Sequence, residues 1–143
     1  MNDNVLNWPA HFPPTDPWKR FFIGVRKLGP DLSFFKELKL QQNLRTEESM
    51  RDWGTSVHRL EIATTLSRII QEYAGWPKPF FLPKDSFATI TYGPTLLEAE
   101  EHPIEDIICK AERLLSRHFD EHFWQTALTK TFGEVVDTIE NGA

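Results

Sequence analysis

Hydrophobic side chains recur every three or four positions along several stretches of this chain, which is the spacing of amphipathic α-helices. The longest stretch is clearest over residues 56–73, where one stripe is formed by Val57, Leu60, Ala63, Leu66, Ile70 and Tyr73. Gly54 can interrupt this pattern, and Gly75 with the prolines after it ends the helix. We therefore expect one long helix over 56–73.

Two helices are predicted ahead of this one. Three prolines make residues 1–15 an extended lead-in, because proline lacks an amide hydrogen and fixes φ. Asp16-Pro17 predicts a helix start, and apolar residues follow it at helical spacing: Trp18, Phe21, Phe22, Val25 and Leu28. Asp31 can cap a second helix, whose apolar face contains Leu32, Phe34, Phe35, Leu38 and Leu40.

Three more helices are predicted in the C-terminal part. The first begins at Pro103 and ends near His118, with an apolar repeat of Ile104, Ile107, Ile108, Ala111, Leu114 and Leu115. A short helix is expected over 121–128. The last begins at Thr131, whose hydroxyl can cap the amide of Glu134 while the Glu134 carboxylate reaches back. Its bundle-facing residues are Phe132, Val135, Val136 and Ile139.

The connection over residues 76–102 is predicted to be a loop. Its segment 87–92 alternates like a short strand, but no partner strand is evident. The predicted fold class is therefore all-α. With 143 residues, 40% of them hydrophobic and 26% charged, the chain is expected to fold around one core. The single cysteine, Cys109, is expected to be buried among the apolar residues of its helix.

Charge is distributed unevenly along the chain. Up to Arg45 there are seven Lys or Arg and four Asp or Glu, a net of +3; from Thr46 onward there are nine and seventeen, a net of −8. The acidic part would repel phosphate backbones, which argues against nucleic-acid binding unless the N-terminal segment binds alone. The basic, aromatic N-terminal helix can pack on its own core, a membrane surface or a protein partner.

Membrane and secretion signals are not evident in the sequence. No apolar run approaches the roughly 18 residues of a membrane helix, and the N-terminus lacks a signal-peptide pattern. We therefore expect a cytoplasmic chain without an integral membrane segment.

The order of predicted helices from about residue 57 to 139 resembles an acyl carrier protein. Thr131-Phe132-Gly133-Glu134 is similar to the Thr-Val-Gly-Asp run that opens the final helix of that family, and Pro83-Lys84-Asp85-Ser86-Phe87 is similar to its Asp-x-Ser-Phe element. The resemblance implies an acyl carrier protein-like helical bundle over 55–143, with 16–54 as an N-terminal helical extension. It also implies a protein partner that binds the acidic region of the second helix at Glu98, Glu100, Glu101, Glu105 and Asp106.

The family's modified serine is absent from its expected place. Carrier proteins esterify a serine at the start of the second helix with phosphopantetheine, whereas this chain has His102-Pro103-Ile104 there. Ser86 is the alternative candidate, because Asp85-Ser86-Phe87 is similar to the family's Asp-Ser-Leu. The residues after Ser86 are poor helix formers, so local turn hydrogen bonds are expected for Ser86 instead. We accordingly expect a non-enzymatic domain without a cofactor that acts through protein contacts.

Two alternatives come from other protein classes. His118-Phe119-Asp120-Glu121-His122 fits the His-x-x-Glu-His pattern of inverted zinc peptidases, in which His118, Glu121 and His122 would serve a metal-dependent hydrolase. Such enzymes need a further carboxylate well downstream, and this motif crosses a predicted helix boundary. No Ser-His-Asp set or phosphate-binding glycine loop is visible. The other alternative is a toxin-immunity or regulatory adaptor.

Overall fold

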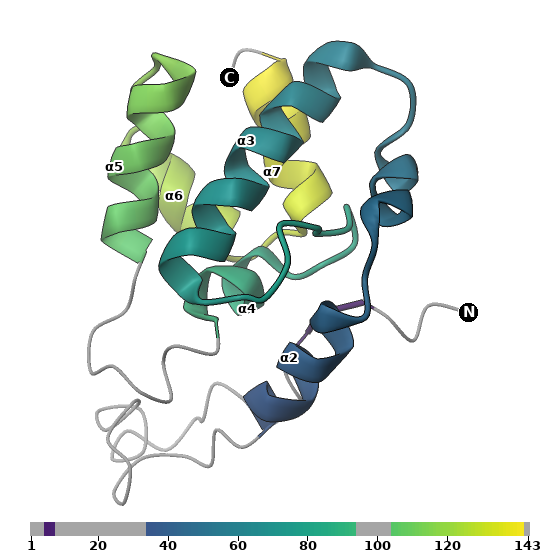
Figure 1. The fold of residues 1–143 in the computed structure, drawn as a ribbon. Helices are drawn as coiled ribbons and strands as arrows, with labels where there is room; N and C mark the ends of the chain where they lie inside the picture. Colours follow the sequence, from purple (N-terminus) through teal and green to yellow (C-terminus); the bar gives the residue numbers. More distant parts are fainter. Residues whose placement is uncertain (1–4, 8–33, 94–103, 142–143) are drawn as a thin grey trace, which may run out of the picture.

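A computed structural model describes residues 5–7, 34–93 and 104–141, which form a helical fold (Figure 1). These residues contain no β-strand, and their one isolated bridge joins Ser86 to Thr131. The predicted all-α class is therefore confirmed for the described part of the chain. The elements are α2 (Phe34–Asn43), the 3-10 helix η1 (Glu47–Trp53), α3 (Val57–Ala74), α4 (Phe87–Tyr92), α5 (Ile104–Leu115), α6 (Glu121–Ala127) and α7 (Phe132–Glu140).

Helix α3 lies at the centre of the fold, as the long apolar pattern predicts. The Ser56 hydroxyl caps its start by accepting from the Arg59 amide, and Gly75, with φ of 83°, ends it in the left-handed conformation that favours glycine. It packs against α4, α5, α7 and η1, with α5 on one side of it and η1 on the other (Figure 1). Gly54, with φ of 85°, does interrupt the pattern and separates η1 from α3.

Several residues of the predicted apolar stripes lie outside the packed contact. Val57 is 71% exposed, Leu40 is 68% exposed and Leu114 is 53% exposed. Their helices do bury the central part of each stripe: Ala63 and Leu66 in α3, Phe35 and Leu38 in α2, and Ile107 and Ala111 in α5. Helical spacing identifies the correct face, but the neighbouring element covers only part of its length.

Aromatic side chains fill much of the core between these helices. Phe132, the first residue of α7, contacts three other buried rings: Trp53 edge-on at 5.1 Å, Phe81 edge-on at 6.3 Å and Phe87 stacked at 6.1 Å between centroids. Each such pair contributes about 0.5–1.5 kcal/mol beyond its buried area. Residues far apart in sequence are thus held together around one phenylalanine.

The start of α7 has the capping box that the sequence predicts. The Glu134 amide donates to the Thr131 hydroxyl at 3.2 Å, and the Thr131 amide donates to the Glu134 carboxylate at 2.9 Å. Gly133 fits here because its backbone lies against Pro83: its amide donates to the Pro83 carbonyl at 2.8 Å, and a Cβ would lie 2.8 Å from the Pro83 Cβ. The predicted bundle-facing residues of α7 are all buried.

The predicted extension over 16–54 can be followed only in part. The helix expected over 16–28 lies outside the described residues, as do Asp31 and Leu32. The second helix is present as α2, and its Phe35 and Leu38, together with Trp53, belong to the same hydrophobic cluster as α3, α5 and α7. The boundary near residue 54 stays a prediction. None of the described helices combines the length and the apolar character needed to cross a membrane.

Candidate functional site

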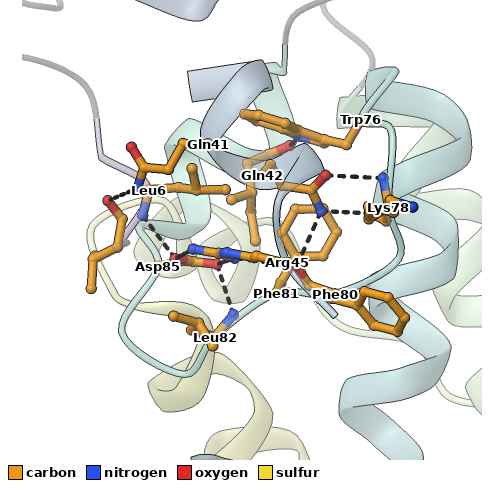
Figure 2. Close-up of polar contacts among 12 residues, drawn as sticks. Leu6, Gln41, Gln42, Arg45, Trp76, Lys78, Phe80, Phe81, Leu82 and Asp85 are labelled. Atoms are coloured by element: carbon orange, nitrogen blue, oxygen red, sulfur yellow. Dashed lines mark hydrogen bonds and ion pairs between the residues drawn. The ribbon is translucent and has the colours of Figure 1, made fainter. Parts of the chain in front are cut away.

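A buried ion pair joins Arg45, which follows α2, to Asp85 in the loop before α4 (Figure 2). The guanidinium donates to both carboxylate oxygens, at 2.6 and 2.9 Å, and the two side chains are 3% and 0% exposed. The same carboxylate accepts from the Leu6 amide at 2.8 Å and from the Leu82 amide at 2.7 Å. Asp85 therefore connects the N-terminal segment, the end of α2 and the loop that leads to α4.

The neighbouring Gln42 fastens α2 to the same loop. Its amide nitrogen donates to the carbonyls of Lys78 at 2.6 Å and Phe80 at 3.1 Å, and its oxygen accepts from the Lys78 amide at 2.9 Å (Figure 2). Gln42 is fully buried. Buried polar groups with partners of this kind fix one arrangement of the chain, because losing a partner leaves a costly unsatisfied group.

The prediction of a loop over 87–92 is wrong, because these residues form α4. The Ser86 hydroxyl accepts from the Thr89 amide at 3.3 Å as the N-cap, and Gly93, with φ of 67°, ends the helix. The Trp76 indole donates to the carbonyl of Ile90 at 2.8 Å, which satisfies a group left free near the helix end. Burial of Phe87 and Ile90 outweighs the poor helix propensity of the threonines.

Ser86 therefore stands at the start of a helix, although the residues after it are poor helix formers. The serine makes a local hydrogen bond, as expected, but it does so at the start of a helix. Its amide donates to the Leu6 carbonyl at 2.9 Å, and its backbone forms an isolated bridge with Thr131. Ser86 is half-buried between the N-terminal segment and the loop before α7.

Helix α4 itself offers little surface to another protein. Five of its six residues are buried: Phe87, Ala88, Thr89, Ile90 and Thr91. The residue before Ser86, Asp85, is fully buried in its ion pair. The helix that follows Ser86 therefore has little exposed surface on which a modifying enzyme could bind.

The acidic residues expected to bind a partner are described only in part. Glu98, Glu100 and Glu101 lie outside the described residues. Glu105 and Asp106 are exposed in the first turn of α5, where carboxylates also interact favourably with the helix dipole. Neither side chain forms an ion pair with another described residue.

The histidine motif is spread over a helix boundary, as the sequence indicates. His118 precedes α6, while Glu121 and His122 lie in its first turn, which begins at the N-cap Asp120. His118 pairs with Glu112 of α5 at 3.2 Å between Nδ1 and Oε2. Across residues 5–7, 34–93 and 104–141, no three His, Cys, Asp or Glu side chains gather so as to hold a metal ion. His118, Glu121 and His122 are thus not brought together as ligands.

Glu112 organises the turn between α5 and α6. Its carboxylate accepts from the Phe119 amide at 2.7 Å and from the Trp124 indole at 3.5 Å, besides its contact with His118. Burial raises the pKa of Glu112, but these hydrogen bonds and the nearby His118 more than offset burial, so the pKa lies below its ordinary value. The charged carboxylate therefore stabilises this turn.

The expectation that Cys109 is buried is wrong. Cys109 is exposed on α5. The helix buries Ile107 and Ala111, and a residue two positions from each lies about 200° around the helix axis. The apolar neighbours of Cys109 in sequence are therefore not its neighbours on the helix surface.

Arg45 and Gln42 are polar residues whose buried roles the sequence did not indicate. They lie in a stretch that reads as a polar break between helices, and their partners are 35–40 positions away. Pairing at such separation leaves no local pattern of capping or periodicity. The sequence does carry a local signal for the start of α4, because serine is a favoured N-cap residue and Ser86 is the N-cap of this helix.

No family model, no curated protein and no solved structure matches this chain.

Proposed function

We propose that this chain is a non-enzymatic, acyl carrier protein-like helical domain that acts through contacts with a protein partner and is not phosphopantetheinylated. The observation that carries the second part is the burial of α4, the helix that Ser86 caps. A transferase must reach a serine hydroxyl and dock beside it. Here the hydroxyl caps its own helix, the preceding Asp85 is fully buried and the helix after it faces the core.

The first turn of α5 is the proposed partner surface. Glu105 and Asp106 are exposed there and form no ion pair with any other described residue. Two adjacent carboxylates of this kind favour a partner with lysine or arginine side chains, and such rim charges mainly set the association rate and the choice of partner. The proposal therefore predicts binding that weakens as salt is added.

Mass spectrometry tests the absence of the prosthetic group. The full chain is incubated with coenzyme A and a broad-specificity phosphopantetheinyl transferase, beside a known carrier protein as the positive control. We expect no change in mass. A stoichiometric adduct that disappears in Ser86→Ala would overturn this part of the proposal, whereas an adduct retained in Ser86→Ala would point to another serine.

Charge reversal tests the partner surface. The double variant Glu105→Lys, Asp106→Lys is compared with Glu61→Lys, Glu72→Lys, which makes the same change in net charge at exposed positions of α3. A partner captured from the source cells by the wild type should be retained by the α3 variant and lost by the α5 variant. Equal retention by both variants would contradict the proposal.

A toxin-immunity or regulatory adaptor would also act through protein contacts. The genes beside this one distinguish the possibilities: biosynthetic genes favour the carrier-like domain, and a toxin gene favours the adaptor.

A further inference from the structure

A second exposed surface, which carries two large apolar side chains, lies at the junction of α2 and η1. Leu40 and Leu44, four positions apart along α2 and its end, are 68% and 82% exposed. Isolated exposed leucines are common, but Leu40 near the end of α2 and Leu44 in the turn that follows it together form an apolar strip. Figure 1 shows η1 and α5 on opposite sides of α3, so this strip is separate from the acidic start of α5.

Leu44 of this strip lines one of two adjoining hollows, which we call the α2–η1 groove. One, of about 350 Å³, is lined in part by Leu44 and Glu48, and the other, of about 270 Å³, is lined in part by Val5 and Lys84. The two hollows share Asp52 and the nearly buried Leu82. The two hollows thus adjoin at Asp52 and Leu82, and Leu44 supplies an apolar side chain to the larger one.

The charges around the groove indicate what it can bind. Arg45 also lines it, but this guanidinium is held by Asp85. Glu48 and Asp52 are exposed and form no ion pair within the described ranges, and Lys84 lies at the far end. In the part of the groove next to Leu44, the two carboxylates thus have no cationic partner among the described residues, and the guanidinium of Arg45 is bound to Asp85. A segment with lysine or arginine beside an apolar residue complements both features.

We propose that the α2–η1 groove binds a cationic, amphipathic segment of a protein partner, which covers Leu44 and Leu82 with an apolar side chain and pairs a lysine or arginine with Glu48 and Asp52. The inference shares with the proposed function the premise that the chain acts through protein contacts, but it concerns a different surface. Separate variants can therefore test the two.

The probe is a fluorescein-labelled peptide of roughly 14 residues, built from leucine and lysine with the spacing of an amphipathic helix. Its binding to the full chain is followed by fluorescence anisotropy in about 0.15 M salt, where distant charges are screened. A peptide with glutamate in place of lysine is the matched control. Circular dichroism verifies that each variant keeps its helical fold.

The variants separate the groove from the other acidic surface. Two double variants alter the groove: one is Leu40→Ser, Leu44→Ser, and the other is Glu48→Lys, Asp52→Lys. We expect each of them to weaken binding of the lysine peptide about tenfold or more. The double variant Glu105→Lys, Asp106→Lys should bind as the wild type does, and the glutamate peptide should not bind.

Four results would overturn the inference. They are no binding of the lysine peptide to the wild type, equal binding to Glu48→Lys, Asp52→Lys, equal binding of the two peptides, or loss of binding only in Glu105→Lys, Asp106→Lys. The last result would leave the proposed partner surface on α5 standing. Light scattering adds another check: a dimer of the wild type that Leu40→Ser, Leu44→Ser dissociates would assign the strip to a second copy of this chain.

Discussion

Replacement of Asp85 by alanine should destabilise the fold severely. The change removes the carboxylate that pairs with Arg45, whose side chain is 3% exposed, and it leaves the Leu6 and Leu82 amides without their acceptor. Breaking a buried ion pair by removing one partner costs about 3–5 kcal/mol, because the remaining charge is uncompensated. A domain of this size has a free energy of unfolding of about 5–15 kcal/mol, so the loss ranges from about a fifth of it to the whole.

Urea unfolding followed by tryptophan fluorescence and circular dichroism measures the loss. The matched control is Asp106→Ala, which removes an exposed aspartate and should change the free energy of unfolding by less than about 0.5 kcal/mol. The double variant Arg45→Met, Asp85→Leu removes both charges and fills similar space. It should be more stable than Asp85→Ala, since no buried charge is left unpaired.

Two results would refute this reasoning. A loss below about 1 kcal/mol in Asp85→Ala would mean that the ion pair contributes little to the folded state. A double variant as unstable as Asp85→Ala would mean that the loss comes from the Leu6 and Leu82 hydrogen bonds and not from the stranded guanidinium. Hydrogen exchange of the Leu6 and Ser86 amides would then show which segment has detached.

Three further outcomes are expected. Gly133→Ala should lower the free energy of unfolding by about 1–3 kcal/mol, because its Cβ would meet Pro83 at 2.8 Å; a thermal melt unchanged from the wild type would contradict this contact. Glu112→Gln should be less stable than the wild type near neutral pH. This difference in stability should shrink as pH falls below the ordinary glutamate pKa of 4.5, because a lowered pKa stabilises the fold only while the carboxylate is charged. Urea titrations that give the same difference at every pH would refute this prediction. Cys109 should react with a thiol reagent in the folded protein at a rate near that in urea, because it is exposed, and strong protection would show that α5 packs differently.

The elements that the sequence predicts best are those whose ends and faces carry strong local signals. Helix α3 has a serine cap, a glycine end and a long apolar stripe, and α7 has a complete capping box before four core residues. These signals depend only on residues within about one or two helical turns. For the same reason they specify the helices but not the extent of their contacts, so the exposure of Val57 and Leu114 was not foreseen.

Helix α4 shows where local reasoning fails. Its threonines and its alternating pattern indicate a loop or strand, yet Phe87 and Ile90 are buried against distant residues, and Trp76 satisfies a carbonyl of its last turn. Tertiary packing overrides weak propensity in so short a segment. The same holds for Ser86, whose role as an N-cap depends on the helix that follows it and therefore on that distant packing.

The bond between Leu6 and Asp85 has a consequence for the order in which this protein can be made. The two residues are 79 positions apart in sequence. At about 5–20 residues per second, a ribosome adds Asp85 about 4–16 s after Leu6. Throughout that interval Leu6 lacks the acceptor for its amide, and Arg45 lacks its counter-charge for about 2–8 s. Until Asp85 has been synthesised, the apolar face of α2 must therefore remain soluble without this contact, either unaided or bound by a chaperone.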